Sequence, residues 1–375
     1  MVNTNKKKKI IFFANTLWFL WNFKYELAKE FIGNGFCVEF VYLKENYLSN
    51  CEKKEVTEKL NLSEIKVSKL KNYKLNTNFY NILLSYTIKC ILYSPLFFYK
   101  CNLKIANYDG LGRIFSSRSI CERIARRFFE KAYLILHNFF FDHTIVLNSS
   151  DLIYFLNKGI NIPSNISILP GTGINKNFFK FNPKYEIDVN KQYITMISRL
   201  NNLKGINDFL ALVYIYNLIF KDIIPDQLIK FRVVVPSKDI RKINKLINKN
   251  EIIKKCLLIV PYSLDVRKIY DTSLCIVHPT VYGEGLPRIY LEAAACGVPV
   301  ITTKNPGYVD FYENYKTALI VEKNNPKQIL DKIKDLIIDS SLRRTLIDNS
   351  KDNLDKYFSN TNKQYILIIN KLFAI

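Results

Sequence analysis

The second half of the chain alternates short apolar runs with longer segments in which apolar residues recur at helical spacing. In chain order we expect a strand at 193–198, a helix from 206, a strand at 231–235, a helix at 240–247, a strand at 256–260, a helix at 264–271 and a strand at 274–277. Helical crossovers of this kind join parallel strands, and the helices then cover both faces of the sheet. The alternation therefore predicts an α/β fold with a parallel sheet.

The first half begins in the same way. Residues 10–14 and 37–43 are expected to be strands, and a helix at 24–32 between them completes a βαβ unit. Further buried strands are expected at 103–106 and 143–147. Both halves of the chain are therefore expected to hold a parallel sheet.

The length of the chain indicates two domains. A chain of 375 residues is too long for one ordinary core, and its 49% of hydrophobic residues can fill two. We place the boundary at the start of a polar linker, 175–191, which gives Rossmann-like domains at 1–174 and 175–356. The remaining segment, 357–375, contains a capped helix that begins with Thr-x-x-Gln at Thr361.

The run Glu-Gly-Leu-Pro-Arg-Ile-Tyr-Leu-Glu, residues 284–292, carries the strongest chemical signal. It follows an expected strand as a glycine-containing loop, and Pro287 is expected at the first position of a helix that Gly297 closes. Free N–H groups at a helix N-terminus suit a phosphate or diphosphate. Carboxylates such as Glu284 and Glu292 beside a phosphate site are repulsive unless they accept hydrogen bonds from hydroxyls, which sugars supply. The run thus indicates a nucleotide-sugar site.

This run resembles the Glu-x7-Glu motif of the family-4 retaining glycosyltransferases. The resemblance extends to His278-Pro279-Thr280, Pro299-Val300-Ile301, Asn305-Pro306-Gly307, Ser198-Arg199-Leu200 and Lys204-Gly205. In the first half, Ala14-Asn15-Thr16 through Asn22-Phe23 and Gly110-Leu111-Gly112 resemble bacterial members that build capsule or O-antigen repeats. The resemblance implies the GT-B fold, which has two Rossmann-like domains with parallel sheets facing across a cleft. The C-terminal helix crosses back to the first domain in that fold.

The resemblance also implies roles for single residues. Glu292 would accept hydrogen bonds from the nucleotide ribose, and Glu284 would contact the transferred sugar. The backbone N–H groups of Gly285 and Leu286, ahead of Pro287, would meet the sugar and the phosphates. The alternative is a surface helix with two exposed glutamates.

Two cations are expected near this run. Arg199 ends the strand at 193–198, and Lys204 lies in the following loop, at the carboxyl edge where open α/β sheets bind ligands. Both match basic positions of the resembled family and would neutralise a departing diphosphate. The alternative is a pair of solvated surface charges.

A protein base for the acceptor hydroxyl is a separate question. In retaining transfer the departing phosphate oxygen can take the proton itself, which leaves position and charge stabilisation to the protein. Many family-4 enzymes carry a histidine in the first domain; the stretch around Asp109 has none, and Asp109 is the substitute candidate. We expect His137 and His143 to be structural. His278 precedes the donor loop and either lines it or is structural as well.

The formal net charge of +22 indicates an anionic partner, unless the abundance of lysine reflects coding bias. A basic helix at 119–136 is expected either to lie on anionic lipid or to present a solvated polar face. Its cations are Arg123, Arg126, Arg127 and Lys131, opposite Ile120, Ile124 and Phe128.

The only two tryptophans, Trp18 and Trp21, are expected in the first strand-to-helix loop. There they either bind a polyprenyl chain or a sugar face, or pack locally.

Two further features of the sequence bear on the location of the protein. The apolar stretch at 80–101 is interrupted by Lys89, Pro95 and Lys100 and is too short to span a membrane; the pattern at 66–75 before it is ambiguous. Eight cysteines without a C-x-x-C pair suit reduced core positions, and no signal peptide follows Lys6–Lys9. We expect a cytoplasmic protein, peripheral on the inner face of the cytoplasmic membrane.

The motifs that the sequence lacks narrow the function. No Asp-x-Asp occurs, so the sequence predicts no metal and no cofactor besides the donor substrate; no Gly-x-Gly-x-x-Gly follows a strand either. The expected donor is a UDP-hexose or UDP-N-acetylhexosamine, and the expected acceptor is an undecaprenyl-diphosphate glycan. Two alternatives are a nucleic-acid-binding protein, for which no known module occurs, and an inactive membrane scaffold.

Overall fold

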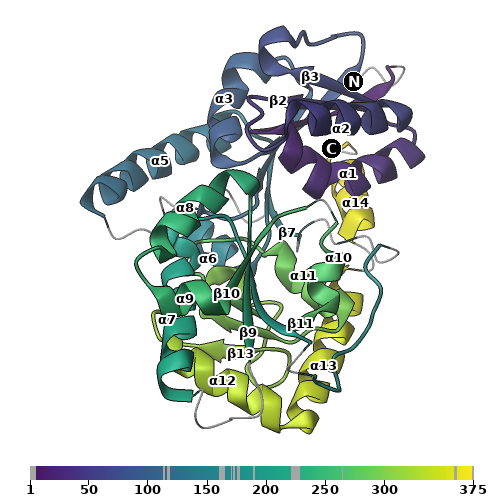
Figure 1. The fold of residues 1–375 in the computed structure, drawn as a ribbon. Coiled ribbons are helices and arrows are strands. Elements are labelled where there is room, and N and C mark those ends of the chain that lie inside the picture. The colour runs from purple at the N-terminus through teal and green to yellow at the C-terminus, as the bar shows by residue number, and fades with distance from the viewer. Residues whose placement is uncertain are drawn as a thin grey trace. The chain divides into compact units, whose positions relative to one another are not determined.

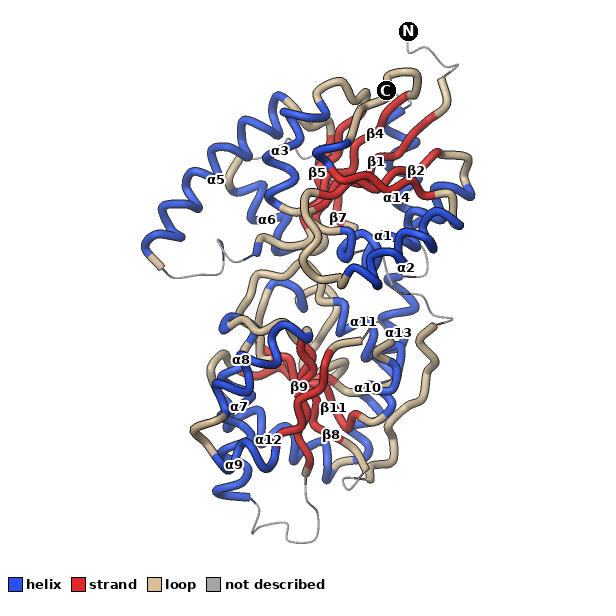
Figure 2. The backbone as a smooth tube through the Cα atoms, turned by 45° about the horizontal axis from the view of Figure 1, so that its top comes forward, coloured by secondary structure: helices blue, strands red, loops and turns tan. Residues whose placement is uncertain are grey.

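The structure of the protein is a computed structural model that describes residues 6–112, 115, 119–159, 165–169, 171, 174, 178–188, 191–220, 229–263, 265–358 and 361–373. The chain forms two compact units. Unit 1 contains Met1–Gly173, Glu284–Leu286 and Asn360–Ile375, and unit 2 contains Ile174–Gly283 and Pro287–Ser359. In each unit, helices cover both faces of one parallel sheet (Figures 1 and 2).

The sheet of unit 1 has seven strands in the order β3-β2-β1-β4-β5-β6-β7. All of its pairings are parallel. The strands are β1 (Lys8–Ala14), β2 (Cys37–Tyr42), β3 (Ile65–Lys69), β4 (Tyr80–Tyr86), β5 (Leu103–Tyr108), β6 (His143–Val146) and β7 (Ile166–Ile168).

The helices of unit 1 divide between the two faces of this sheet. They are α1 (Leu17–Gly33), α2 (Asn50–Leu62), α3 (Ile88–Phe98), α5 (Ile120–Phe139), α6 (Ser149–Asn157) and α14 (Thr361–Phe373), with a 3-10 turn η1 (Leu70–Asn72). Alternate residues of β1 show the division: Ile10 and Phe12 are buried against α1, α2 and α14, and Ile11 and Phe13 are buried on the α3 side. The C-terminal helix α14 thus packs in unit 1, as the sequence predicted.

Helix α1 begins earlier than the sequence predicted. The Thr16 side chain accepts a hydrogen bond from the Phe19 N–H (3.1 Å) and so caps a helix that starts at Leu17. The prediction of a loop around Trp18 and Trp21 was therefore wrong. Trp18 packs against Phe23 and Tyr47, and Trp21 packs against Tyr25.

The apolar stretch at 80–101 is also resolved into two elements. It forms β4 and then α3, which carries Pro95 inside its sequence. The ambiguous segment before it contains β3 and η1. Within the part of the chain that the structure describes, no helix is long and apolar enough to cross a membrane.

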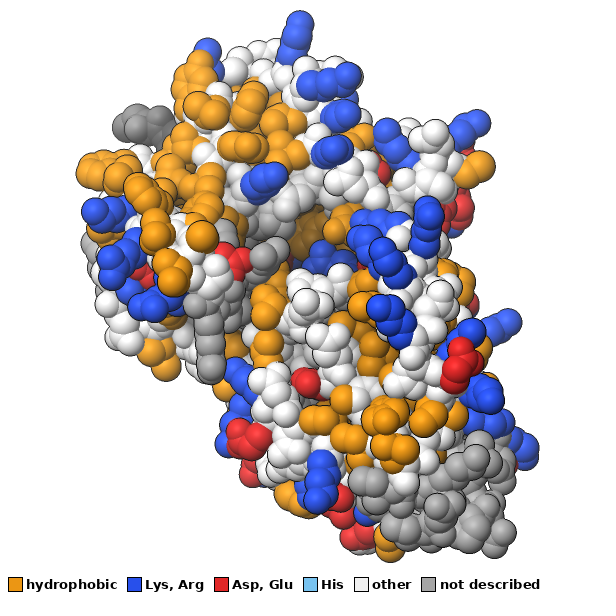
Figure 3. All heavy atoms as spheres, turned by 60° about the vertical axis from the view of Figure 1, so that its left-hand side comes forward, with side chains coloured by type: hydrophobic (Ala, Val, Ile, Leu, Met, Phe, Trp, Pro, Cys, Tyr) orange, Lys and Arg blue, Asp and Glu red, His pale blue; other side chains and the backbone are white. Residues whose placement is uncertain are grey.

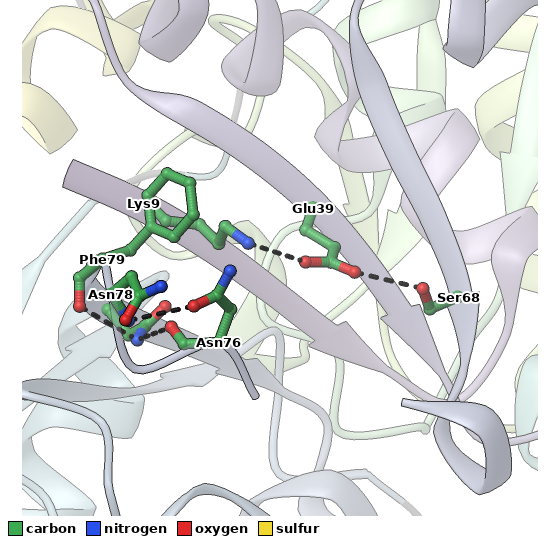
Figure 4. Close-up of polar contacts among 7 residues, drawn as sticks. Lys9, Glu39, Ser68, Asn76, Asn78 and Phe79 are labelled. Carbon is green, nitrogen blue, oxygen red and sulfur yellow. Dashed lines mark hydrogen bonds and ion pairs between the residues drawn. The ribbon is translucent and has the colours of Figure 1, made fainter. Parts of the chain in front are cut away.

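A charged pair lies on the sheet of unit 1 near the start of β1 (Figure 4). Lys9 Nζ lies 3.3 Å from Glu39 Oε2 and 4.2 Å from the centre of the Phe79 ring. The Ser68 hydroxyl donates to the other Glu39 oxygen (3.1 Å). Both oxygens of the buried Glu39 are therefore satisfied, and the pair links β1, β2 and β3.

The sheet of unit 2 has six strands in the order β10-β9-β8-β11-β12-β13, and all of its pairings are parallel. The strands are β8 (Tyr193–Ile197), β9 (Lys230–Val235), β10 (Leu257–Pro261), β11 (Ser273–His278), β12 (Val300–Thr303) and β13 (Leu319–Val321).

The helices of unit 2 lie between its strands along the chain, and two in succession follow β9 and β13. They are α7 (Ile206–Ile215), continued by the π-helical η4 (Tyr216–Phe220), then α8 (Ser237–Ile247), α9 (Glu251–Cys256), α10 (Arg267–Asp271), α11 (Arg288–Cys296), α12 (Pro326–Ile338) and α13 (Ser340–Phe358), with 3-10 turns η3 (Asn202–Lys204) and η5 (Pro306–Tyr308). The predicted α/β class with a parallel sheet in each half is confirmed. Helix α9 was missed because it is short and lies directly before β10.

Helix α11 closes as the sequence predicted and begins one residue later. Gly297 caps its C-terminus with φ of +69°, and an added Cβ there would lie 2.5 Å from Pro183 Cα. Pro287 is the N-cap residue, with extended backbone, and the first helical residue is Arg288.

Candidate active site

Two neighbouring loops lie at the carboxyl edge of the sheet in unit 2. Strands β8 and β11 are paired, and each is followed by a loop that carries residues of the predicted site. The Val281 N–H donates to the Leu203 carbonyl (2.8 Å), and the Thr280 hydroxyl donates to the same oxygen (3.2 Å). These bonds hold the loop after β8 against the loop after β11.

Gly205 permits this close approach. Its φ is +80°, and a Cβ added there would lie 2.1 Å from the Pro279 carbonyl oxygen. A residue with a side chain would therefore be strained in its backbone and would also collide with the neighbouring loop.

The two predicted cations lie on the first of these loops in different environments. Lys204 ends η3 and is 7% exposed, and its ammonium lies 4.8 Å from the centre of the Tyr282 ring. Arg199 follows β8 and is exposed. Lys204 is thus buried at the two loops, whereas the Arg199 side chain is exposed to solvent.

Glu292 lies inside unit 2 with both of its oxygens engaged. Its side chain projects from α11, the residue is 6% exposed, and it accepts one hydrogen bond from the Tyr270 hydroxyl and one from Arg288 Nε, both at 2.7 Å. Burial and the charge of Glu292 raise the pKa of Tyr270 well above its usual value, so Tyr270 remains a donor. The carboxylate is therefore oriented by fixed donors and keeps further lone pairs.

His278 ends β11 and is buried, with the Tyr290 hydroxyl as a neutral neighbour. Its Nδ1 lies 3.1 Å from the Tyr290 hydroxyl, which lies 2.7 Å from the Thr302 hydroxyl. Asn305 Nδ2 donates to the same Tyr290 hydroxyl (3.4 Å). His278 thus joins β11 to α11 and β12.

Glu284, Gly285 and Leu286 belong to unit 1, where Gly285 contacts Asp109. The Gly285 N–H donates to the Asp109 carbonyl (3.1 Å), and Asn148 Nδ2 donates to the Gly285 carbonyl (2.8 Å). A Cβ on Gly285 would lie 2.8 Å from the Asp109 carbonyl carbon. The structure thus brings two of the predicted site residues together and gives the Gly285 N–H a partner.

The Asp109 side chain forms an ion pair with a lysine that sequence reasoning did not select. Asp109 follows β5, and its Oδ1 lies 3.0 Å from Nζ of Lys24 on α1, whose side chain is 2% exposed. Asn148, the N-cap of α6, was missed as well, although its spacing to Asp151 is a helix-start signal. The sequence holds no comparable signal for Lys24, which lies 85 residues before its partner.

The two histidines of unit 1 lie in its interior. His137 Nε2 is 2.7 Å from the Tyr108 hydroxyl and its Nδ1 is 2.9 Å from the Thr144 hydroxyl, while His143 Nε2 is 3.0 Å from the Ser167 hydroxyl. Burial lowers the pKa of His137 to about 3 and that of His143 to about 4, so both are neutral near pH 7.

The comparisons with known proteins agree with this architecture. Residues 177–353 match the family described as glycosyl transferases group 1. HepE from Anabaena, crystallised with UDP-glucose, is 15% identical with a TM-score of 0.74, covering 98% of this chain and 100% of that one. Sucrose-phosphate synthase from Thermosynechococcus elongatus gives a TM-score of 0.73 at 17% identity over 98% of this chain and 100% of that one.

Named relatives match over parts of their length. The capsular polysaccharide biosynthesis glycosyltransferase CapM of Staphylococcus aureus is 37% identical over 28% of this chain and only 27% of its own length. An N,N'-diacetylbacillosaminyl-diphospho-undecaprenol alpha-1,3-N-acetylgalactosaminyltransferase of Campylobacter jejuni is 25% identical over 70% of this chain and 68% of its own length.

The two parallel-sheet units and their structural neighbours define a GT-B protein. The family match across most of unit 2 shows that residues 177–353 form a glycosyl transferases group 1 domain within this fold.

Proposed function

We propose that this protein is a glycosyltransferase that moves a hexose or N-acetylhexosamine from a UDP-sugar to a lipid-linked glycan, with retention of configuration, in bacterial surface polysaccharide synthesis. The Campylobacter relative, whose name specifies a diphospho-undecaprenol acceptor, supports the acceptor class. HepE, crystallised with UDP-glucose, supports the donor, and CapM supports the pathway.

The observation that carries this proposal is the pair of loops after β8 and β11. Lys204 is held on one of them, and the other leads to α11 and the buried Glu292. Lys204, Arg199 and the N-terminus of α11 would neutralise the diphosphate, with Leu286 and Pro287 at its entrance. Glu292 would accept hydrogen bonds from the ribose, since its fixed donors leave lone pairs open.

In the transfer step that we propose, no protein side chain forms a covalent bond to the sugar. The acceptor hydroxyl oxygen bonds to the anomeric carbon, and the bond from that carbon to the diphosphate oxygen breaks with its electron pair. The hydroxyl proton passes to the departing phosphate oxygen on the same face. Glu284 would contact the transferred sugar, and the protein supplies position and charge stabilisation.

We further propose that cationic side chains and backbone N–H groups, rather than a metal ion, hold the diphosphate. Transfer should then persist in excess EDTA, measured as UDP release with a lipid-diphosphate acceptor. Loss of transfer that manganese restores would contradict this assignment.

The exposed face of α3 and α5 supports contact with an anionic membrane (Figure 3). Apolar side chains of both helices and of Tyr99, the C-cap of α3, reach solvent; those of the helices are Tyr93, Leu96, Phe97, Ile120, Ile124, Phe128, Ile135 and Phe139. Arg123, Arg127 and Lys131 on α5 are exposed as well. Ile124 is 54% exposed and Phe128 72%, so these two apolar side chains of α5 lie outside the core. Anionic lipid matches both features.

The membrane proposal is tested with vesicles. The protein should sediment with anionic vesicles at low salt and be released as ionic strength rises. Phe128→Asp should reduce sedimentation, whereas Leu62→Asp on α2, which also replaces an exposed apolar side chain (86%), should not. Equal binding to neutral vesicles would contradict an electrostatic contribution.

The donor class is tested by thermal shift with UDP, GDP and single-stranded DNA. Stabilisation by UDP supports the proposal, and stabilisation by DNA alone would favour the nucleic-acid alternative. A turnover screen of nucleotide sugars against lipid-diphosphate acceptors would then identify the transferred sugar.

A further inference from the structure

Lys24 is unusual because it is a lysine on the buried face of α1, a helix that covers the sheet of unit 1. Its side chain is 2% exposed, and its only ion-pair partner among the described residues is Asp109, at 3.0 Å. Burial lowers the pKa of Lys24, and the Asp109 carboxylate opposes that shift. Burying an ammonium is costly unless it is paired, and the fold keeps this one next to a candidate site residue.

The surroundings of the pair are aromatic and come from three elements. Lys24 Nζ lies 4.1 Å from the centre of the Tyr86 ring on β4 and 5.4 Å from that of Phe19 on α1. Tyr365 of α14 donates its hydroxyl to Asn107, and burial followed by the Asp109 charge raises its pKa well above the usual value. Among the described residues, Lys24, Tyr86 and Tyr365 are thus the titratable groups that face Asp109.

The two carboxylate oxygens of Asp109 differ. Oδ1 accepts from Lys24, whereas Oδ2 is buried and accepts no hydrogen bond from the described part of the chain. A buried carboxylate oxygen without a donor is costly. The Asp109 backbone also receives the Gly285 N–H, next to the predicted sugar-contacting Glu284.

The buried ammonium limits what Asp109 can do. If Asp109 took up a proton during transfer, Lys24 would be left as an uncompensated charge in the interior. Asp109 is therefore suited to remain an anion and to accept a hydrogen bond, and is poorly suited to be the proton-accepting base that the sequence suggested.

Resting on the proposed function, we propose that Lys24 is a positioning residue for sugar transfer. It fixes Asp109 as an oriented anion, whose Oδ2 accepts a hydrogen bond from a sugar hydroxyl. The hydroxyl proton that is lost in the reaction still passes to the departing phosphate oxygen, so Asp109 is not consumed as a base.

The test compares Lys24→Met, Lys24→Arg and a matched control, Lys9→Met. Lys9 also pairs with a buried carboxylate (3.3 Å) and also lies over an aromatic ring (4.2 Å), but it is bound to Glu39. Lys24→Met should lower kcat/KM for the acceptor at least tenfold while the Kd for UDP changes less than twofold. Lys24→Arg keeps the charge and should stay within about threefold. Lys9→Met should change neither constant.

The split between the two constants separates positioning from a purely structural role. If Lys24→Met lowered UDP affinity as much as kcat/KM, or if Lys24→Arg lost as much activity as Lys24→Met, the proposal would be overturned.

A double variant keeps the proposal testable if Lys24→Met does not fold. Lys24→Met with Asp109→Asn leaves no uncompensated buried charge, and it is compared with Asp109→Asn alone. If Lys24 acts through Asp109, adding Lys24→Met should cost less than twofold in kcat/KM. A loss of tenfold or more would overturn the proposal. A wild-type protein that binds no UDP would instead overturn the proposed function itself.

Discussion

Glu292 in unit 2 and Asp109 in unit 1 are both carboxylates held by a cation, but they are held differently. Glu292 accepts from Arg288, one helical turn before it, and from Tyr270, 22 residues away. Asp109 accepts on one oxygen only, from a lysine 85 residues away, and its other oxygen is unsatisfied among the described residues.

This difference indicates that the two carboxylates have different roles in substrate binding. A carboxylate whose two oxygens are both fixed by donors presents an unchanging acceptor, which suits the constant part of a substrate such as a nucleotide ribose. A carboxylate with one oxygen left over suits a group that arrives during the reaction. We therefore assign binding of the nucleotide to unit 2 and contact with a sugar hydroxyl to unit 1.

The largest expected effect concerns Glu284, which lies in unit 1 with Gly285. If Glu284 contacts the transferred sugar, Glu284→Ala should lower turnover by about a hundredfold or more, because interactions that strengthen in the transition state act on rate. UDP affinity should stay within a few fold. Steady-state transfer and calorimetry measure the two effects. Glu313→Ala, an exposed glutamate paired with Lys316, is the control and should change neither.

A second prediction concerns Gly205 and the two loops at the carboxyl edge of the sheet in unit 2. Gly205→Ala should lower the free energy of unfolding by about 2 kcal/mol or more, because a left-handed backbone and a contact with Pro279 both oppose a methyl group. It should also weaken UDP by displacing Lys204. Gly33→Ala in α1 is the control, since a Cβ there meets nothing within 4 Å. Equal stability of the two variants in urea would contradict the role given to Gly205.

A smaller effect is expected in the pH dependence of stability, which should differ between unit 1 and unit 2 because of His137. His137 has its pKa lowered from 6.5 to about 3, so the unfolded chain binds its proton first and stability is lost as the pH falls below 6.5. The expected loss at pH 5 is about 2 kcal/mol for this residue. Hydrogen exchange should show it in β5 and β6 of unit 1, and His137→Gln should make the dependence shallower. An unchanged slope in that variant would refute this origin.

The fold of unit 2 was predictable because its signals are local. Strand β11, the closing Gly297 and the alternation of elements lie in short windows of sequence, and Glu292 lies inside one nine-residue motif. The helix start at Leu17 was missed because the capping bond of Thr16 outweighed the aromatic, loop-like composition that follows it. Element boundaries depend on such single bonds.

The site of unit 1 could be predicted only in part. Asp109 was selected as a substitute for the first-domain histidine of the resembled family, but its partner Lys24 has the sequence context of an ordinary helical lysine. The pair exists only because β1 and β5 flank β4 in one sheet, which brings α1 to the end of β5. Contacts of this sequence separation follow from topology, which a single sequence does not specify.

The most direct test of the account is the affinity of UDP for Glu292→Ala, measured by calorimetry beside the wild type and Glu284→Ala. Removing hydrogen bonds of about 1.5–3 kcal/mol to the ribose should weaken UDP roughly ten- to a hundredfold in Glu292→Ala. Glu284→Ala should bind UDP within a few fold of the wild type. If Glu284→Ala abolished UDP binding while Glu292→Ala left it intact, the assignment of the nucleotide to Glu292 and unit 2 would be wrong.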